Sequence, residues 1–138
     1  MRQTLIWIML GFPAAAALSS FWFGSELQRF ADEVKTFSST ADLERFKAVV
    51  ARQMYAALAQ VLLLGLPFVA YLVGLSNGAL GVGDVSYVIS PSMVILVLGL
   101  RYRKVEGAVR KTPAATPQLE DARDAIVRTW LKKPLPDW

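Results

Sequence analysis

The stretch "SMVILVLGLRYRKVEGAVRK", Ser92 to Lys111, changes character at one residue. From Met93 to Leu100 every residue is apolar or glycine, and basic residues are frequent from Arg101 onward. Such a step is typical of a membrane span that ends at the cytoplasmic surface. It could also be the edge of a buried protein core. The placement of charge over the rest of the chain distinguishes these two interpretations.

Charge is scarce in this chain and is clustered. Of its 138 residues, 54% are hydrophobic and only 19% are charged, whereas charged residues make up about a quarter of a typical soluble domain. No charged residue occurs between Thr4 and Phe23, and only Asp84 and Arg101 occur between Gln53 and Tyr102. A globular domain spreads charge over all its surface elements. The clustering therefore favours an all-α membrane protein.

Three apolar segments are candidate transmembrane helices, at about 4–23, 54–75 and 85–100. Twenty residues at helical rise cover about 30 Å, the thickness of the hydrocarbon core. The third segment is shorter and contains Pro91. Gln60 is the only strongly polar side chain of the second segment, and we expect it to make an interhelical hydrogen bond.

The first segment has two other interpretations. It could be a signal peptide, with "AAAALSS" (14–20) as a weak cleavage context. It could also be a helix that lies along the membrane interface, but such helices carry a polar face, and no face of this segment carries charge. We therefore expect a retained span.

Basic residues predict the orientation of the spans. Fourteen of the fifteen lie in segment 24–53 or after Leu100, and the remaining one is Arg2. Cytoplasmic loops of membrane proteins are enriched in Lys and Arg. The sequence therefore predicts a multi-pass inner-membrane protein with the N-terminus outside and the C-terminus in the cytoplasm.

Segment 24–53 is predicted to be helical and cytoplasmic. We expect Gly24 to end the first span and Ser25 to cap a short amphipathic helix. Its apolar stripe would lie on the membrane, on a partner or on neighbouring helices of this chain. A second helix is expected to begin near Asp42, capped by Ser39 or Thr40, and to continue into the second span. The members of the stripe are Leu27, Phe30, Val34 and Phe37.

The region 101–138 is predicted to be a basic cytoplasmic tail, separate from a transmembrane region 1–100. It contains a linker at 112–116 and an amphipathic helix at 117–133, with Thr116 as N-cap and Pro117 in the first turn. The narrow apolar stripe of this helix must dock on the chain's own helices, the membrane or another protein. The predicted docking residues are Leu119, Ala122, Ile126, Trp130 and the C-terminal Trp138.

Three basic residues follow the third span directly: Arg101, Arg103 and Lys104. Side chains of this kind attract anionic lipid head groups, and they also enforce topology. Both interpretations remain open. Because the basic residues flank apolar segments, we do not expect a nucleic acid partner.

The residue types needed for most chemistry are missing. The chain has no His and no Cys, which removes the commonest metal ligands and the commonest general base. No Asp, Glu, Lys, Arg or His lies within the three spans, although transporters and proton relays place such groups there. We therefore expect no catalytic, cofactor-binding or metal-binding residue, and no transport activity by this chain alone.

These features predict a small accessory or structural subunit of a larger bacterial inner-membrane complex. Its partners would be membrane lipids and larger integral membrane subunits. One alternative is a self-assembling pore-former, because three spans with a basic cytoplasmic tail are similar in topology to one class of phage holins. A membrane enzyme or lipid-binding module that uses the basic residues after Leu100 is a third possibility.

Overall fold

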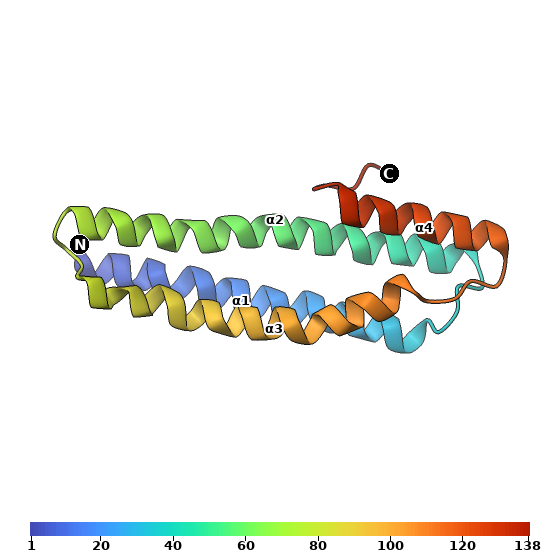
Figure 1. Ribbon diagram of the computed structural model, residues 1–138, viewed down its shortest axis with the longest axis horizontal. Coiled ribbons are helices and arrows are strands. Elements are labelled where there is room, and N and C mark those ends of the chain that lie inside the picture. Colours follow the sequence, from blue (N-terminus) through green and yellow to red (C-terminus); the bar gives the residue numbers. More distant parts are fainter. The chain divides into compact units, whose positions relative to one another are not determined.

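The computed structural model describes residues 1–138 and is all-helical, with 83% helix and no strands. Three of its helices are long and apolar enough to cross a membrane, as expected for the predicted class of a multi-pass α-helical membrane protein. Figure 1 shows the helices. They are α1 (Arg2–Glu33), α2 (Thr40–Ser76), α3 (Ser86–Arg110) and α4 (Pro117–Lys132), with a 3₁₀ helix, η1 (Val82–Val85), before α3.

Two compact units share these helices. The apolar unit comprises Met1–Phe21 and Ala59–Leu100, and the polar unit comprises Trp22–Leu58 and Arg101–Trp138. The polar unit thus combines the predicted cytoplasmic segment 24–53 with the predicted tail 101–138. Each of α1, α2 and α3 contributes residues to both units.

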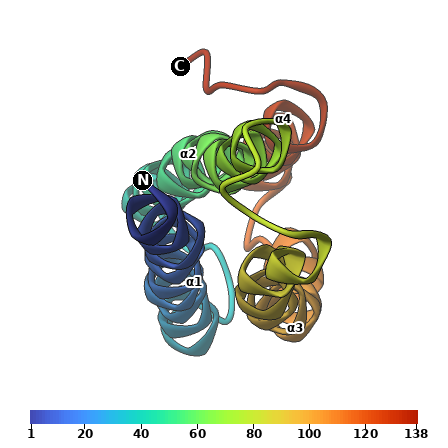
Figure 2. The same ribbon diagram turned by 90° about the vertical axis from the view of Figure 1, so that its left-hand side faces the viewer.

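The apolar unit has a small core where the first turns of α1 pack beside α2 (Figure 2). Its buried residues are Met9, Tyr71, Leu80 and Val88. Most other large apolar side chains of this unit are exposed. Such exposure is costly in water but natural for a helix surrounded by lipid tails.

The turn between α2 and η1 is tight. Gly78 has φ +67°, a left-handed conformation that only glycine adopts without strain. The hydroxyl of Tyr71 donates a hydrogen bond to the carbonyl oxygen of Val82, 3.3 Å away. The glycine-rich segment after Leu75 is therefore a packed turn.

The polar unit has a larger core built around aromatic rings. The rings of Phe30 and Phe46 stack with their centres 5.5 Å apart, and the ring centre of Phe37 lies 5.3 Å from that of Phe46. α4 runs alongside the first turns of α2 (Figure 1), and its Trp130 ring meets Phe46 edge-on at 6.4 Å. The predicted stripe of segment 24–37 is thus covered by the chain's own helices. All its members belong to this core: Leu27, Phe30, Val34 and Phe37.

The predicted helix break at Gly24 is wrong, because α1 continues without interruption to Glu33. Ser25 is therefore inside the helix and is not an N-cap. A Cβ atom added at Gly24 would lie 2.3 Å from ring carbons of Tyr102 on α3. The glycine allows the backbone of α1 to approach α3 closely, a role that its local sequence does not reveal.

α2 begins as predicted and runs as one helix from Thr40 to Ser76. The Ser39 hydroxyl accepts a hydrogen bond from the backbone N–H of Asp42, whose carboxylate in turn accepts one from the N–H of Ser39. This reciprocal arrangement satisfies free N–H groups at the helix start. The Asp42 carboxylate accepts hydrogen bonds from the backbone N–H and the hydroxyl of Ser38 and from the N–H of Ser39. These bonds hold the pKa of Asp42 below its usual value.

The segment before α4 is tied to the rest of the polar unit. The N–H of Phe37 donates to the carbonyl oxygen of Pro113 at 2.8 Å, and the N–H of Ala115 donates to the carbonyl oxygen of Phe37 at 2.9 Å. Thr116 then caps α4 by accepting from the N–H of Leu119. The predicted linker at 112–116 is therefore held by an isolated β-bridge, which the sequence did not indicate.

Candidate functional site

The apolar unit contains only two charged residues, Arg2 and Asp84, and they bind one another. The Arg2 guanidinium lies 3.0 Å from the Asp84 carboxylate. That carboxylate also accepts a hydrogen bond from the backbone N–H of Gly81. Neither of these two side chains is therefore left without an oppositely charged partner.

Gln60 lies in the apolar unit and links α2 to α1. Its side-chain nitrogen donates a hydrogen bond to the Ser20 hydroxyl at 2.7 Å, and the Ser19 hydroxyl is 3.5 Å away. Both hydroxyls also donate to the carbonyl oxygen of Ala16 on their own helix. The group joins two helices and contains no acid, base or activated nucleophile.

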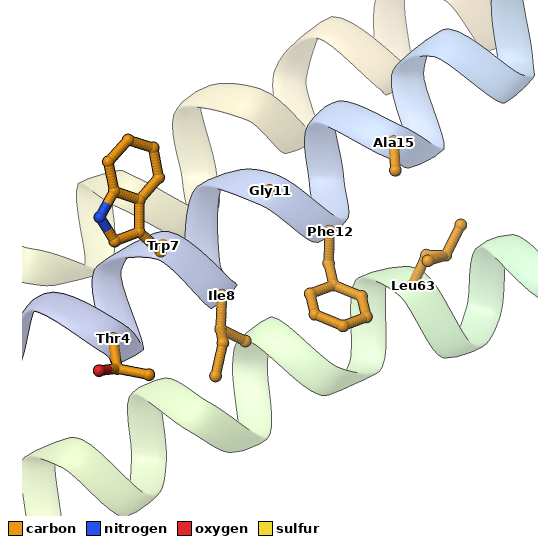
Figure 3. A pocket seen from close by; sticks show the side chains of 7 residues that line it. All are labelled: Thr4, Trp7, Ile8, Gly11, Phe12, Ala15 and Leu63. Carbon is orange, nitrogen blue, oxygen red and sulfur yellow. The ribbon is translucent and has the colours of Figure 1, made fainter. Parts of the chain in front are cut away.

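An apolar groove runs along α1 in the apolar unit (Figure 3). Ile8 and Phe12 point from α1 toward α2. The groove measures about 390 Å³, near the lower end of the range for small-molecule sites. It can hold an apolar chain but offers no group for acid–base chemistry. The lining residues are Thr4, Trp7, Ile8, Gly11, Phe12, Ala15 and Leu63.

The structure places the predicted docking stripe of α4 inside the polar unit. Leu119 and Ile126 are buried, and Ala122 and Trp130 pack against the same core. Of the three surfaces on which this stripe could dock, the chain's own helices are the ones it contacts. Any partner would meet other faces of α4.

Trp138 lies apart from that stripe and is exposed, together with Leu131 and Leu135. We call these three residues, which are close to one another in the sequence, the C-terminal patch. Asp137 holds the end of the chain to α4, because it accepts a hydrogen bond from the Thr129 hydroxyl and forms an ion pair with Lys133. The Lys133 ammonium lowers the pKa of Asp137. The patch therefore lies on an ordered part of the chain.

The basic residues after the third apolar segment are exposed and free of acidic partners. No carboxylate lies within ion-pair distance of Arg101, Arg103 or Lys104, and the same holds for Lys111. The Arg101 guanidinium lies 5.9 Å from the ring centre of Tyr102. Several other basic residues of the polar unit are paired, for example Arg45 with Glu33, Arg52 with Glu26 and Arg110 with Glu106.

Two further arginines have structural roles that the sequence analysis missed. Arg123 is only 9% exposed and donates a hydrogen bond to the carbonyl oxygen of Thr112 at 2.7 Å, which fixes the segment before α4. Its spacing from Leu119 and Ile126 places it on the apolar stripe, a signal that was available in the sequence. Arg110 lies over the Trp130 ring, 4.9 Å from its centre.

Because the chain has no His and no Cys, Asp and Glu are its only side chains of the usual metal-binding types. No group of three or more of them lies close enough together to hold a metal ion. Comparison of the chain with protein-family models, curated proteins and solved structures found no match.

Proposed function

We propose that this chain is a small, non-catalytic accessory subunit of a larger complex in a bacterial inner membrane. The observation that carries the proposal is the C-terminal patch. Its three apolar side chains, Leu131, Leu135 and Trp138, are 57%, 42% and 44% exposed. They belong to the polar unit, which holds all but two of the charged residues and is suited to water.

The distribution of charge supports a membrane location for the apolar unit and an aqueous location for the polar unit. Fourteen of fifteen basic residues lie in the polar unit. Because cytoplasmic segments are enriched in Lys and Arg, this asymmetry favours a cytoplasmic polar unit and an external N-terminus. In that orientation the C-terminal patch would face water rather than lipid.

Exposed apolar patches on a polar surface mark sites where a protein, a membrane or a ligand binds, and in water we take the occupant to be another protein. Tyrosine and tryptophan anchors contribute a large share of the binding energy at such interfaces. The ties from Thr129 and Lys133 to Asp137 hold Trp138 in place before a partner arrives, and this pre-organisation lowers the entropic cost of binding. Meanwhile only 6% of the most apolar stretch of Val82–Arg110 is buried, which leaves room for larger integral membrane subunits.

Purification in a mild detergent tests the proposal. We expect the tagged wild-type protein to co-purify with a larger integral membrane protein, and a variant with Leu131→Gln and Trp138→Gln to lose it. Val82→Gln serves as the control, because Val82 is an exposed apolar residue of the apolar unit, outside the polar unit. Recovery of a lone 15.2 kDa species would contradict the proposal.

The same purification distinguishes an accessory subunit from the alternative function, a self-assembling pore-former. A pore-former would be recovered as a homo-oligomer, and its expression would collapse the membrane potential. The apolar unit contains only two charged side chains, Arg2 and Asp84, and they are paired with one another, which weighs against a hydrated pore lined by charged side chains.

A further inference from the structure

One face of α3 within the polar unit is directed away from the core. The opposite face packs inward: Val109 is fully buried, and Tyr102 contacts Gly24 on α1. The Tyr102 hydroxyl also lies 3.4 Å from the Ser25 hydroxyl. At 3.6 residues per turn, Lys104 and Lys111 fall on the side of the helix opposite Tyr102.

Four cations occupy this outward face and its two edges, and none has an acidic partner in the chain. Lys104 and Lys111 lie at its centre, with Arg101 and Arg103 on either side. We call these four residues the basic face. In contrast, Arg110 is turned inward by its ion pair with Glu106 and by the Trp130 ring. Within α3, the unpaired charge therefore lies on the outer side of the helix.

Between the two lysines the helix offers open space. Gly107 lies three residues after Lys104 and four before Lys111, so it shares their face. A Cβ atom added at Gly107 would have no neighbouring atom within 4 Å. A tetrahedral anion could thus approach the helix surface between two ammonium groups.

The same helix indicates the kind of anion. Along the side that carries Lys104 and Lys111, the preceding turns of α3 present only apolar side chains. Four of them are exposed: Met93 (52%), Leu96 (54%), Val97 (61%) and Leu100 (57%). A ligand that lies along this side of α3 must have an apolar part beside the turns before Arg101 and an anionic group beside the basic face. Membrane phospholipids with a net negative head group have this chemistry.

We propose that the basic face of α3 binds the phosphate of an anionic phospholipid in the cytoplasmic leaflet, with an acyl chain along the apolar turns before it. The basic face then has a specific ligand in addition to its effect on topology. This proposal does not depend on the subunit role and holds equally for a chain that functions alone.

Native mass spectrometry of the full-length protein tests the proposal. The protein is released from mixed micelles that contain equal amounts of phosphatidylglycerol and phosphatidylcholine, and the retained lipids are counted. We expect the wild type to retain phosphatidylglycerol preferentially. Each basic residue near an anionic surface strengthens binding about fivefold. The triple variant Arg103→Gln, Lys104→Gln and Lys111→Gln should therefore lower the preference by about a hundredfold.

The matched control removes the same net charge elsewhere. Arg29, Arg128 and Lys132 are also exposed and have no acidic partner in the chain. Their triple replacement by Gln should leave the lipid preference unchanged. An equal loss in both triple variants would show that net charge, not the basic face, selects the lipid, and would overturn the proposal.

A single substitution provides a second test that does not remove any basic residue. Gly107→Glu places a carboxylate between Lys104 and Lys111, where open space accepts it, and we expect it to reduce phosphatidylglycerol retention. Ala125→Glu, at an exposed position of α4, adds the same charge and should have no effect. Equal retention of both lipids by the wild type would refute the proposal, as would displacement of the lipid by inorganic phosphate.

Discussion

Replacing Gly24 by alanine should disturb the contact between α1 and α3 in the polar unit. The new methyl carbon would lie 2.3 Å from Cδ2 and Cε2 of Tyr102 and 2.6 Å from its Cγ. Carbon atoms at van der Waals contact are about 3.5–4.0 Å apart. Since Cγ lies on the Cβ–Cγ axis about which the ring turns, a rotation of the ring does not relieve the clash. The two helices must separate, or Tyr102 must leave its place.

The magnitude follows from two opposing effects. Overpacking of this kind costs about 1–3 kcal/mol. Replacing glycine by alanine inside a helix stabilises it by about 1 kcal/mol. Gly107→Ala provides the control, because Gly107 is also helical and has open space where the methyl group would go. The difference between the two variants isolates the clash, and we expect Gly24→Ala to be less stable by about 1–3 kcal/mol.

Unfolding in increasing dodecyl sulfate, followed by circular dichroism in the far ultraviolet, measures both variants against the wild type. We expect Gly107→Ala to be slightly more stable than the wild type and Gly24→Ala to be less stable than Gly107→Ala. Adding Tyr102→Ala to Gly24→Ala removes the clash, so the two changes together should cost less than their sum. Equal stabilisation by both glycine replacements would refute the proposed close approach of α1 and α3.

Three further outcomes are expected. Phe37→Ala should destabilise the polar unit by about 3–5 kcal/mol in denaturant unfolding, because a fully buried ring is removed; a cost near zero would contradict the aromatic core. Asp42 has a pKa below the usual 3.8, chiefly because it accepts hydrogen bonds from Ser38, so its stabilising effect is present above pH 3.8 and is lost as the pH falls through the lowered value. The protection of amide hydrogens at the start of α2, measured relative to the intrinsic exchange rate at each pH, should therefore fall in acid, and Asp42→Asn should remove this pH dependence; protection that still falls in the variant would assign it to another group. Gln60→Leu should cost no more than about 1 kcal/mol in dodecyl sulfate unfolding, since hydrogen bonds between membrane helices average about 0.6 kcal/mol and Ser20 keeps its bond to its own helix. A loss of several kcal/mol would show that the amide organises more of the apolar unit than its two serine contacts.

Local signals in the sequence were sufficient for most helix boundaries. Thr116 and Pro117 mark the start of α4, and Ser39 with Asp42 marks the start of α2. Each signal is a hydrogen bond or a backbone restriction between residues that are close in sequence. The three apolar spans were predicted for the same reason, since their length and lack of charge are local properties.

Contacts between distant residues could not be predicted in this way. Gly24 looks like a helix breaker until Tyr102, which follows it by 78 positions, is seen against its backbone. The bridge between Phe37 and Ala114 likewise joins two segments with no matching pattern. The exposed Leu131 and Leu135 were overlooked because they lie outside the periodic stripe of α4, and only the structure shows which side of that helix is covered.

The central claim is that the apolar unit lies in lipid while the polar unit lies in the cytoplasm. The chain contains no cysteine, so single cysteines can be labelled without interference. Three exposed positions suffice: Asn77 in the turn after α2, Val97 in the apolar part of α3 and Ala125 on α4. Each is replaced by cysteine and treated with a membrane-impermeant maleimide, first in intact cells and then after permeabilisation.

We expect Asn77→Cys to react in intact cells, Ala125→Cys to react only after permeabilisation, and Val97→Cys to resist the reagent in both states. Reaction of Val97→Cys at the rate of the other two positions would show that water surrounds the apolar helices and would contradict the membrane assignment. Reaction of Ala125→Cys in intact cells would show that the polar unit lies outside the cytoplasm and would contradict the proposed orientation.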